Sequence, residues 1–182
     1  MKPTLRSRLL LWGSAAVVVL ADQISKVWVI HTLPFGIPSN PLPWLRPILS
    51  FTYITNTGVA FGLFPQAGDF FKLLSAAVIF GIFLFQRSLA PQDWVTHLAL
   101  GLQVGGALGN LVDRFVRGSV VDFLDVNFWP FKRWAVFNLA DSAIVVGVFI
   151  LLLNAMWQER QAALASDPTP SEALSEEMTP NG

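Results

Sequence analysis

The chain has no cysteine, so its 182 residues can form no disulfide bond, no thiolate metal site and no cysteine nucleophile. The only two histidines, His31 and His97, are separated by a predicted membrane span, which argues against an imidazole metal site. The sequence therefore favours chemistry that needs neither a metal nor a cysteine, and we expect no cofactor.

Charged residues are also scarce. They make up 13% of the chain, against about 25% in an ordinary soluble domain. Hydrophobic residues make up 53%, and the mean hydropathy is +0.54. The formal net charge is +0, so no basic field exists to attract nucleic acid, and we expect no nucleic-acid partner. This composition predicts a small integral membrane protein.

Four apolar runs have the character of membrane spans, which must cross a hydrocarbon core of about 30 Å. They cover Leu9–Ile30, Phe70–Phe85, Trp94–Val112 and about 135–156. The first run follows three basic residues and could alternatively begin a cleavable signal peptide. Its apolar pattern resumes after Lys26, however, which gives it the length of a span. We therefore expect an all-α integral membrane protein with four transmembrane helices.

The segments outside the spans differ in composition. Five prolines between Thr32 and Pro47 prevent a helix or a central strand there. Alternation from Ser50 onward, followed by Asn56-Thr57-Gly58, indicates a short strand and a turn, with Asn56 as a turn former. We expect a surface β and extended segment over about 35–64.

The end of the chain is rich in Ser, Pro, Ala and Glu and lacks aromatic residues after Glu159. Such a composition cannot bury enough apolar surface to fold. We expect residues 1–158 to form the membrane domain and residues 159–182 to form a disordered tail.

Basic residues are equally numerous on the two sides of the four spans. One side holds Lys2, Arg6, Arg8, Arg87 and Arg160, and the other holds Arg46, Arg114, Arg117, Lys132 and Arg133. The first helix usually dominates the positive-inside rule, and three of these residues precede it. We expect both termini in the cytoplasm and the β element outside.

Several polar side chains lie inside or at the ends of these apolar runs, where they are costly and usually functional. They are Asp22, Lys26, Asn110, Asp113, Arg114, Asp122, Asn138 and Asp141. The i, i+4 spacing of Asp22 and Lys26 allows an ion pair, although Lys26 could instead extend to the interface. A glycine at every fourth position from Gly101 to Gly109 predicts close helix packing.

Asp122 and Asp141 are the catalytic candidates. Asp122 follows the third span, and Asp141 lies about two turns inside the fourth, so folding can bring the two carboxyl groups together. Repulsion between them would leave one protonated at neutral pH. The ionised group could then activate water, while the protonated group donates a hydrogen bond to the scissile carbonyl. This arrangement suits amide hydrolysis.

Three alternatives remain open at this level. Asp125 could replace Asp122, and the two would share a face in a helix but not in a strand. Asp122 could be a solvated loop acid near Arg117. Asp141 could serve only as a structural hydrogen-bond partner of Asn110 or Arg114.

Five motifs occur in a fixed order along the chain. They are DQISK at Asp22–Lys26, NTGVAFG at Asn56–Gly62, GGALGNLVDR at Gly105–Arg114, VVDF at Val120–Phe123 and FNLADS at Phe137–Ser142. Together they resemble the motif set of bacterial lipoprotein signal peptidase, or signal peptidase II. The resemblance covers Leu9 to about Trp157, and it is specific because several separate motifs share order and spacing.

The resemblance implies a four-span inner-membrane aspartic endopeptidase. Such an enzyme removes the signal peptide of prolipoproteins just before a diacylglyceryl-modified cysteine, and cyclic peptides of the globomycin type inhibit it. By motif position the dyad falls on Asp122 and Asp141. Supporting or substrate-binding roles fall on Asp22, Lys26, Asn56, Asn110, Arg114 and Asn138. The implied partners are the lipid-modified substrate and membrane lipid.

Two other classes of function compete with a peptidase. Intramembrane Asp22, Lys26 and Asp141 could mark the path of a proton- or cation-coupled transporter. The lack of a detectable inverted repeat argues against this. A non-catalytic assembly subunit would use the same polar groups and the glycines only to pack helices.

Overall fold

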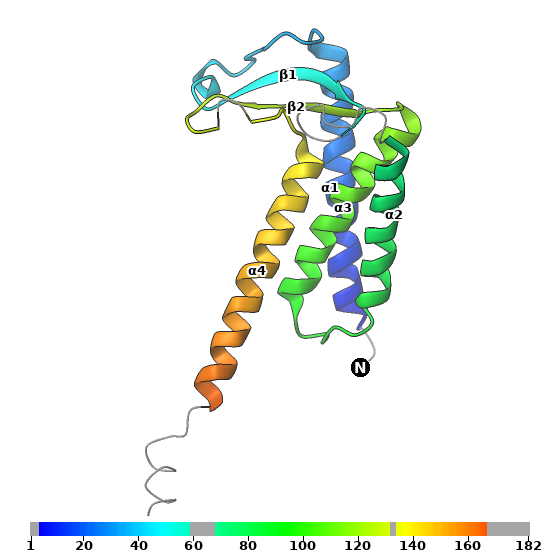
Figure 1. Cartoon of the computed structure of the whole chain (residues 1–182), viewed down its shortest axis with the longest axis vertical. Coiled ribbons are helices and arrows are strands. Elements are labelled where there is room, and N and C mark those ends of the chain that lie inside the picture. Colours follow the sequence, from blue (N-terminus) through cyan, green and yellow to red (C-terminus); the bar gives the residue numbers. More distant parts are fainter. Residues whose placement is uncertain (1–3, 59–67, 132–133, 167–182) are drawn as a thin grey trace, which may run out of the picture.

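The computed structural model describes residues 4–58, 68–131 and 134–166. These residues form a bundle of helices with a two-stranded sheet across one end (Figure 1). The helices are α1 (Leu5–Thr32), α2 (Gly68–Phe85), α3 (Trp94–Val116) and α4 (Leu139–Ser166), and the strands are β1 (Leu49–Asn56) and β2 (Val120–Val126).

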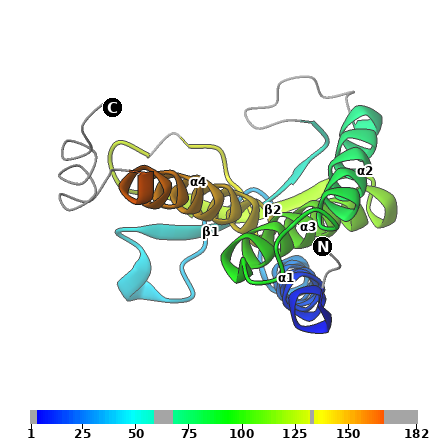
Figure 2. The same cartoon turned by 90° about the horizontal axis from the view of Figure 1, so that it is seen from below.

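All four helices are long and apolar enough to cross a membrane, as the sequence predicts. α3 lies at the centre of the bundle, with α1, α2 and α4 packed against it (Figure 2). The outer faces of α2 and α4 expose large apolar side chains such as Phe80, Phe149 and Leu153, which suits contact with lipid. α1 begins and α4 ends at the end of the bundle opposite the sheet (Figure 1).

α4 differs from the prediction at both ends. It begins only at Leu139, so Asp141 lies in its first turn rather than about two turns inside. It also continues to Ser166, although the sequence predicts a disordered tail from Glu159. The intervening residues are mostly Glu, Arg, Gln, Ala and Leu, which are strong helix formers even without an apolar face. The remainder of the predicted tail, 167–182, lies outside the described residues.

The sheet pairs β1 with β2 in antiparallel fashion, and the register shifts by a bulge between Phe51 and Ile54. The proline-rich segment runs beside β1, where the Gly36 N–H donates to the Tyr53 carbonyl at 2.8 Å. Val121 and Phe123 of β2 are buried against Val29 of α1. The predicted surface β and extended segment is therefore present as far as Gly58, and its remainder, 59–64, lies outside the described residues.

Glycines let α3 approach two neighbours closely. On one side, a Cβ atom at Gly105 would lie 2.7 Å from the Ala15 carbonyl oxygen of α1. On the other side, a Cβ atom at Gly106 would lie 2.3 Å from the Ala140 carbonyl oxygen of α4. The predicted small-residue packing is thus confirmed, and it extends to a second face that the spacing of four does not reveal.

A buried ion cluster joins α1 to α3 at the sheet end of the bundle. The Lys26 ammonium lies 2.8 Å from Asp22 Oδ2 and 2.9 Å from Asp113 Oδ2, and all three side chains are fully buried. Arg117 pairs with the other oxygen of Asp113, and Gln23 donates to both carboxylates. The alternative in which Lys26 extends to the interface is therefore wrong. Two carboxylates and two cations make the cluster formally neutral.

Replacing Lys26 by Met should destabilise the protein strongly, because Asp22 and Asp113 would stay buried without their shared cation. We expect a loss of about 3–5 kcal/mol of unfolding free energy. Thermal unfolding in detergent checks this. The matched control is Lys72→Met, since Lys72 pairs with the exposed Asp69 at the surface and this pair should contribute little to stability. Equal melting temperatures for the two variants would contradict the role of the cluster.

Replacing Gly106 by Ala should push the start of α4 away from α3. Neither the Ala140 carbonyl nor the nearby Ile144 side chain leaves room for a methyl group, so we expect a cost of about 1–3 kcal/mol. Gly13→Ala is the control, because nothing lies within 4 Å of a Cβ atom there. A melting temperature for Gly106→Ala at or above that of Gly13→Ala would refute the close contact.

Candidate active site

The first turn of α4 fixes two of the candidate residues by reciprocal hydrogen bonds. The Asp141 N–H donates to Asn138 Oδ1 at 2.9 Å, and the Asn138 N–H donates to Asp141 Oδ2 at 3.3 Å. This is the pattern of a capping box, in which the N-cap and N3 residues satisfy each other's backbone donors. The sequence Asn-Leu-Ala-Asp therefore begins the helix and orients the Asp141 carboxylate at the same time.

Asparagine side chains connect the two candidate carboxylates. Asn110 of α3 donates to Asp141 Oδ1 at 2.7 Å, and Asn138 donates to Asp122 Oδ1 at 2.7 Å. Asn138 also donates to Asn110 Oδ1 at 3.1 Å, and the Lys26 ammonium reaches the same oxygen at 3.1 Å. The amide network thus ties Asp122 and Asp141 to each other and to the ion cluster.

Asp122 lies on β2 with its side chain 2% exposed, so it is not a solvated loop acid. Asn56 of β1 donates to its second oxygen at 3.2 Å. Asn56 also accepts the Gly58 N–H at 3.0 Å, so it is the turn former that the sequence predicts as well as a partner of Asp122.

Asp125 is separated from the site by the alternation of the strand. VVDFLDV forms a β-strand, in which an odd offset sends side chains to opposite faces. Asp125 accepts a hydrogen bond from Thr52 at 2.7 Å, whereas Asp122 faces Asn56 and Asn138. The geometry favours Asp122 over Asp125 as the member of the pair.

A cavity of about 550 Å³ opens beside the two carboxylates. It lies between the sheet end of α3, the start of α4, and α2. Its polar lining consists of Asn56, Asn110, Arg114, Asp122, Asp141 and Ser142, and its apolar lining includes Phe71, Val120, Trp134, Val145 and Val146. This size and mixture are typical of ligand sites, which are mostly apolar with a few converging polar groups.

Arg114 faces the cavity from α3. Its guanidinium lies 5.5 Å from the ring of Phe71 on α2, and one of its nitrogens donates to the Asn110 carbonyl at 3.4 Å. Within the described residues its Nε is buried without a hydrogen-bond partner, and it forms no ion pair with Asp122 or Asp141. A guanidinium that lines a cavity and has no carboxylate partner among the described residues can donate to a ligand there.

The ion cluster also holds the backbone of the site. Asp22 Oδ1 accepts the Ala140 N–H of α4 at 3.0 Å, and Asp113 Oδ2 accepts the Val121 N–H of β2 at 3.0 Å. Ala140 directly precedes Asp141 in the sequence, and Val121 directly precedes Asp122. Asp113 is absent from the set of site residues inferred from the motifs, although it continues the spacing of four from Gly101 through Gly109 and thus faces α1.

The environment of Asp122 favours its protonated form. Burial is the main cause, and the nearby Asp141 carboxylate adds to it, so that the pKa of Asp122 is raised to about 7. Hydrogen bonds from Asn56 and Asn138 and the charge of Lys26 oppose this increase.

Among residues 4–58, 68–131 and 134–166, no three His, Asp or Glu side chains form a group that could hold a metal ion.

Comparison with known proteins identifies the family. The sequence profile of the family described as "Signal peptidase (SPase) II" matches residues 14–157. Proteins named lipoprotein signal peptidase are similar over most of their length. The protein from Desulfitobacterium hafniense is 39% identical, over 84% of this chain and 97% of its own. The protein from Syntrophomonas wolfei is 40% identical, over 83% of this chain and 98% of its own.

Solved structures of membrane enzymes share the fold of this chain. A structure described as a bacterial membrane enzyme, determined by the in meso method at 2.3 Å resolution, superposes with a TM-score of 0.75 at 28% identity. The match covers 87% of this chain and 92% of that one. A second structure with that description, at 1.9 Å resolution, gives a TM-score of 0.70 at 28% identity and covers 92% of this chain and 97% of that one. The chain belongs to the signal peptidase II family of membrane proteases.

Proposed function

We propose that the enzyme cleaves prolipoproteins immediately before a diacylglyceryl-modified cysteine, with Asp122 and Asp141 as its catalytic dyad. One observation carries the assignment of the residues. The two carboxylates line the same cavity, and both accept hydrogen bonds from Asn138, one from its side chain and one from its backbone. The motif positions of the family agree with this choice, and the asparagine network keeps the pair together without neutralising it.

The two acids have different roles in this mechanism. Asp122 holds the shared proton, because its side chain is buried whereas that of Asp141 is only partly buried, and because the pKa of Asp122 is raised to about 7. Asp141 is ionised, and it receives a side-chain and a backbone hydrogen bond at the positively polarised start of α4. It removes a proton from water, which attacks the scissile carbonyl. Asp122 donates a hydrogen bond to the carbonyl oxygen. When the tetrahedral intermediate collapses, Asp122 helps to protonate the leaving nitrogen.

The walls of the cavity suit a lipid-modified peptide. Phe71, Val145 and Val146 present apolar surface from two membrane-spanning helices, where an acyl chain can lie. Asn56 and Arg114 can bind peptide carbonyl groups next to the dyad. Globomycin-type cyclic peptides should compete for the same cavity. We place the enzyme in the bacterial inner membrane with both termini in the cytoplasm, so that this end of the bundle faces outward.

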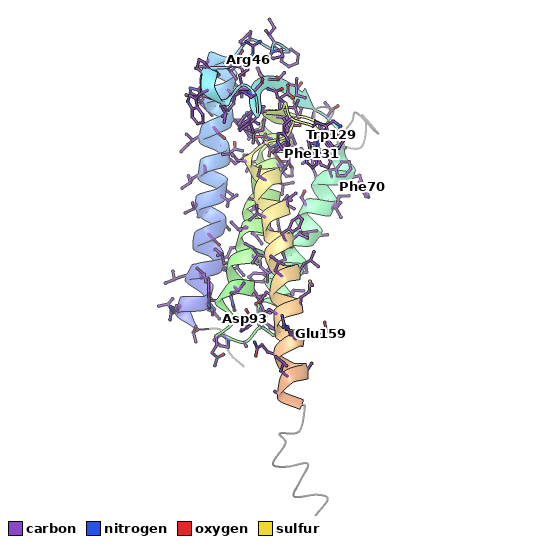
Figure 3. The ribbon with its side chains drawn as sticks, turned by 90° about the vertical axis from the view of Figure 1, so that its left-hand side faces the viewer. Arg46, Phe70, Asp93, Trp129, Phe131 and Glu159 are labelled. Atoms are coloured by element: carbon purple, nitrogen blue, oxygen red, sulfur yellow. The ribbon has the colours of Figure 1, made fainter. Side chains whose placement is uncertain are left out.

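A proton- or cation-coupled transporter would need polar groups along the whole bundle. The ionisable and amide groups around Lys26 instead gather at the sheet end of the bundle. Asp93 lies at the opposite end, apart from this group (Figure 3). Membership in a protease family also favours catalysis over a role as an assembly subunit.

Replacing either dyad acid by Asn should abolish most cleavage. Each change removes a proton-transfer group and keeps its shape, so we expect kcat/KM to fall by about 10²–10⁴-fold. The assay uses purified protein and a diacylglyceryl-modified prolipoprotein, with an unlipidated precursor to test the lipid requirement.

Asp125→Asn is the matched control for these two variants and should keep nearly full activity, because Asp125 bonds only to Thr52 among the described residues. Melting temperatures in detergent must be compared, since a buried Asp→Asn change can unfold a bundle. Normal cleavage by a folded Asp122→Asn or Asp141→Asn protein would overturn the dyad.

The activity should depend on the proton of Asp122. As pH rises through about 7, this proton is lost and kcat/KM should decline. Asn56→Ala removes a donor that favours the ionised form, so the pKa should rise and the alkaline decline should move to higher pH. Thr52→Val serves as the control and should leave the profile in place. A decline that moves to lower pH in Asn56→Ala would assign the proton to another group.

A further inference from the structure

A second cavity lies at the opposite end of the bundle from the dyad. It has a volume of about 180 Å³ and is lined by Arg8 and Trp12 of α1, by Phe83 of α2, and by Gln86 and Arg87 just after α2. The proposed peptidase mechanism uses none of these residues.

Two arginines bring uncompensated positive charge to this cavity. Neither Arg8 nor Arg87 pairs with a carboxylate in the part of the chain that the structure describes. The Arg87 guanidinium lies 5.3 Å from the ring of Phe83, which fixes it at the cavity wall. Planar guanidinium groups match the oxygens of a phosphate, to which they can donate two parallel hydrogen bonds.

The remaining lining residues fit a site at the level of lipid headgroups. Trp12 and Phe83 are in contact, with ring centroids 6.3 Å apart, and Gln86 is buried, where it donates to the Phe83 carbonyl. Leu9 and Phe85, next to the cavity in sequence, are 62% and 55% exposed and would face lipid. Charged groups thus meet apolar surface where α1 begins and α2 ends.

The cavity also lies where the bundle has a weak contact. α1 and α2 both pack against α3, but they make few contacts with each other. Trp12 and Phe83 form one of these contacts. A ligand that binds an arginine from each side would join two helices that otherwise associate mainly through a third.

We propose that this cavity binds the phosphate of an anionic phospholipid from the membrane leaflet opposite the dyad, between Arg8 and Arg87. Basic pockets between membrane helices are suited to such headgroups, and the acyl chains would lie along the exposed faces of α1 and α2. The lipid would stabilise the α1–α2 contact, and this role does not depend on the peptidase reaction.

The test compares lipids that differ only in charge. Full-length protein in detergent is mixed with phosphatidylglycerol, with phosphatidylcholine of the same acyl chains, or with inorganic phosphate. Melting temperature and bound lipid, measured by native mass spectrometry, are recorded. At a lipid concentration about ten times the dissociation constant, phosphatidylglycerol should raise the melting temperature by roughly 3–6 °C. Equal effects of the two lipids, or equal protection by inorganic phosphate, would overturn the proposal.

Single substitutions locate the site. Arg8→Gln and Arg87→Gln should each remove most of the difference between the two lipids. Arg6→Gln removes the same charge from the same end of α1, but Arg6 does not line the cavity, so this variant should behave like the wild type. If Arg6→Gln loses the effect to the same extent, the attraction is only a general surface charge, and there is no site.

The acidic end of the chain is the competing occupant. Residues 167–182 contain Asp167, Glu172, Glu176 and Glu177 and no basic residue. A protein that ends at Ser166 should respond to phosphatidylglycerol as the full chain does. A response that appears only after this truncation would show that the tail, and not lipid, occupies the cavity in the intact protein.

Discussion

The structure depends on the charge pairing around Lys26. A lone ammonium or carboxylate in this apolar interior would be strongly unfavourable, so Lys26, Asp22 and Asp113 are stable there only together. Each carboxylate also accepts a backbone N–H, from Ala140 at the start of α4 and from Val121 in β2. The requirement to neutralise one buried cation therefore fixes the relative positions of four elements. It also brings the backbone next to Asp141 and Asp122 to the same place.

Neutral amides surround the two acids, and this has a chemical consequence. Asn56, Asn110 and Asn138 donate hydrogen bonds to Asp122 and Asp141 without adding a formal charge. Lys26, whose charge also acts on Asp122, is already paired with two other carboxylates. A direct ion pair with Asp122 would favour its ionised form and remove the proton that the proposed mechanism requires. Hydrogen bonding by asparagine instead orients the acids while burial keeps the pKa of Asp122 near 7.

Local patterns in the sequence predict much of this arrangement. The i, i+4 spacing predicts the Asp22–Lys26 pair, and the glycine spacing predicts the close approach of a neighbouring helix to α3, which the structure identifies as α1. Continuing that spacing by one more step would also have placed Asp113 opposite α1. Likewise, Asn138 and Asp141 carry a readable capping signal, but the apolar residues before them suggested an earlier helix start. The choice between Asp122 and Asp125 could not be made locally, because it depends on pairing with β1, more than sixty residues away in sequence.

The two acids lie on different kinds of element, and this makes the pair asymmetric. Asp141 is in the first turn of a long helix, where free backbone N–H groups and the helix dipole favour negative charge. Asp122 lies on β2 of a two-stranded sheet, which has only a small net dipole, and its side chain is more deeply buried than that of Asp141. If two equivalent carboxylates faced each other, the proton would have no preferred position. In the proposed mechanism, placing one acid on a helix start and the other on a strand gives each a separate role, so the junction of sheet and bundle is where this fold can support acid–base chemistry.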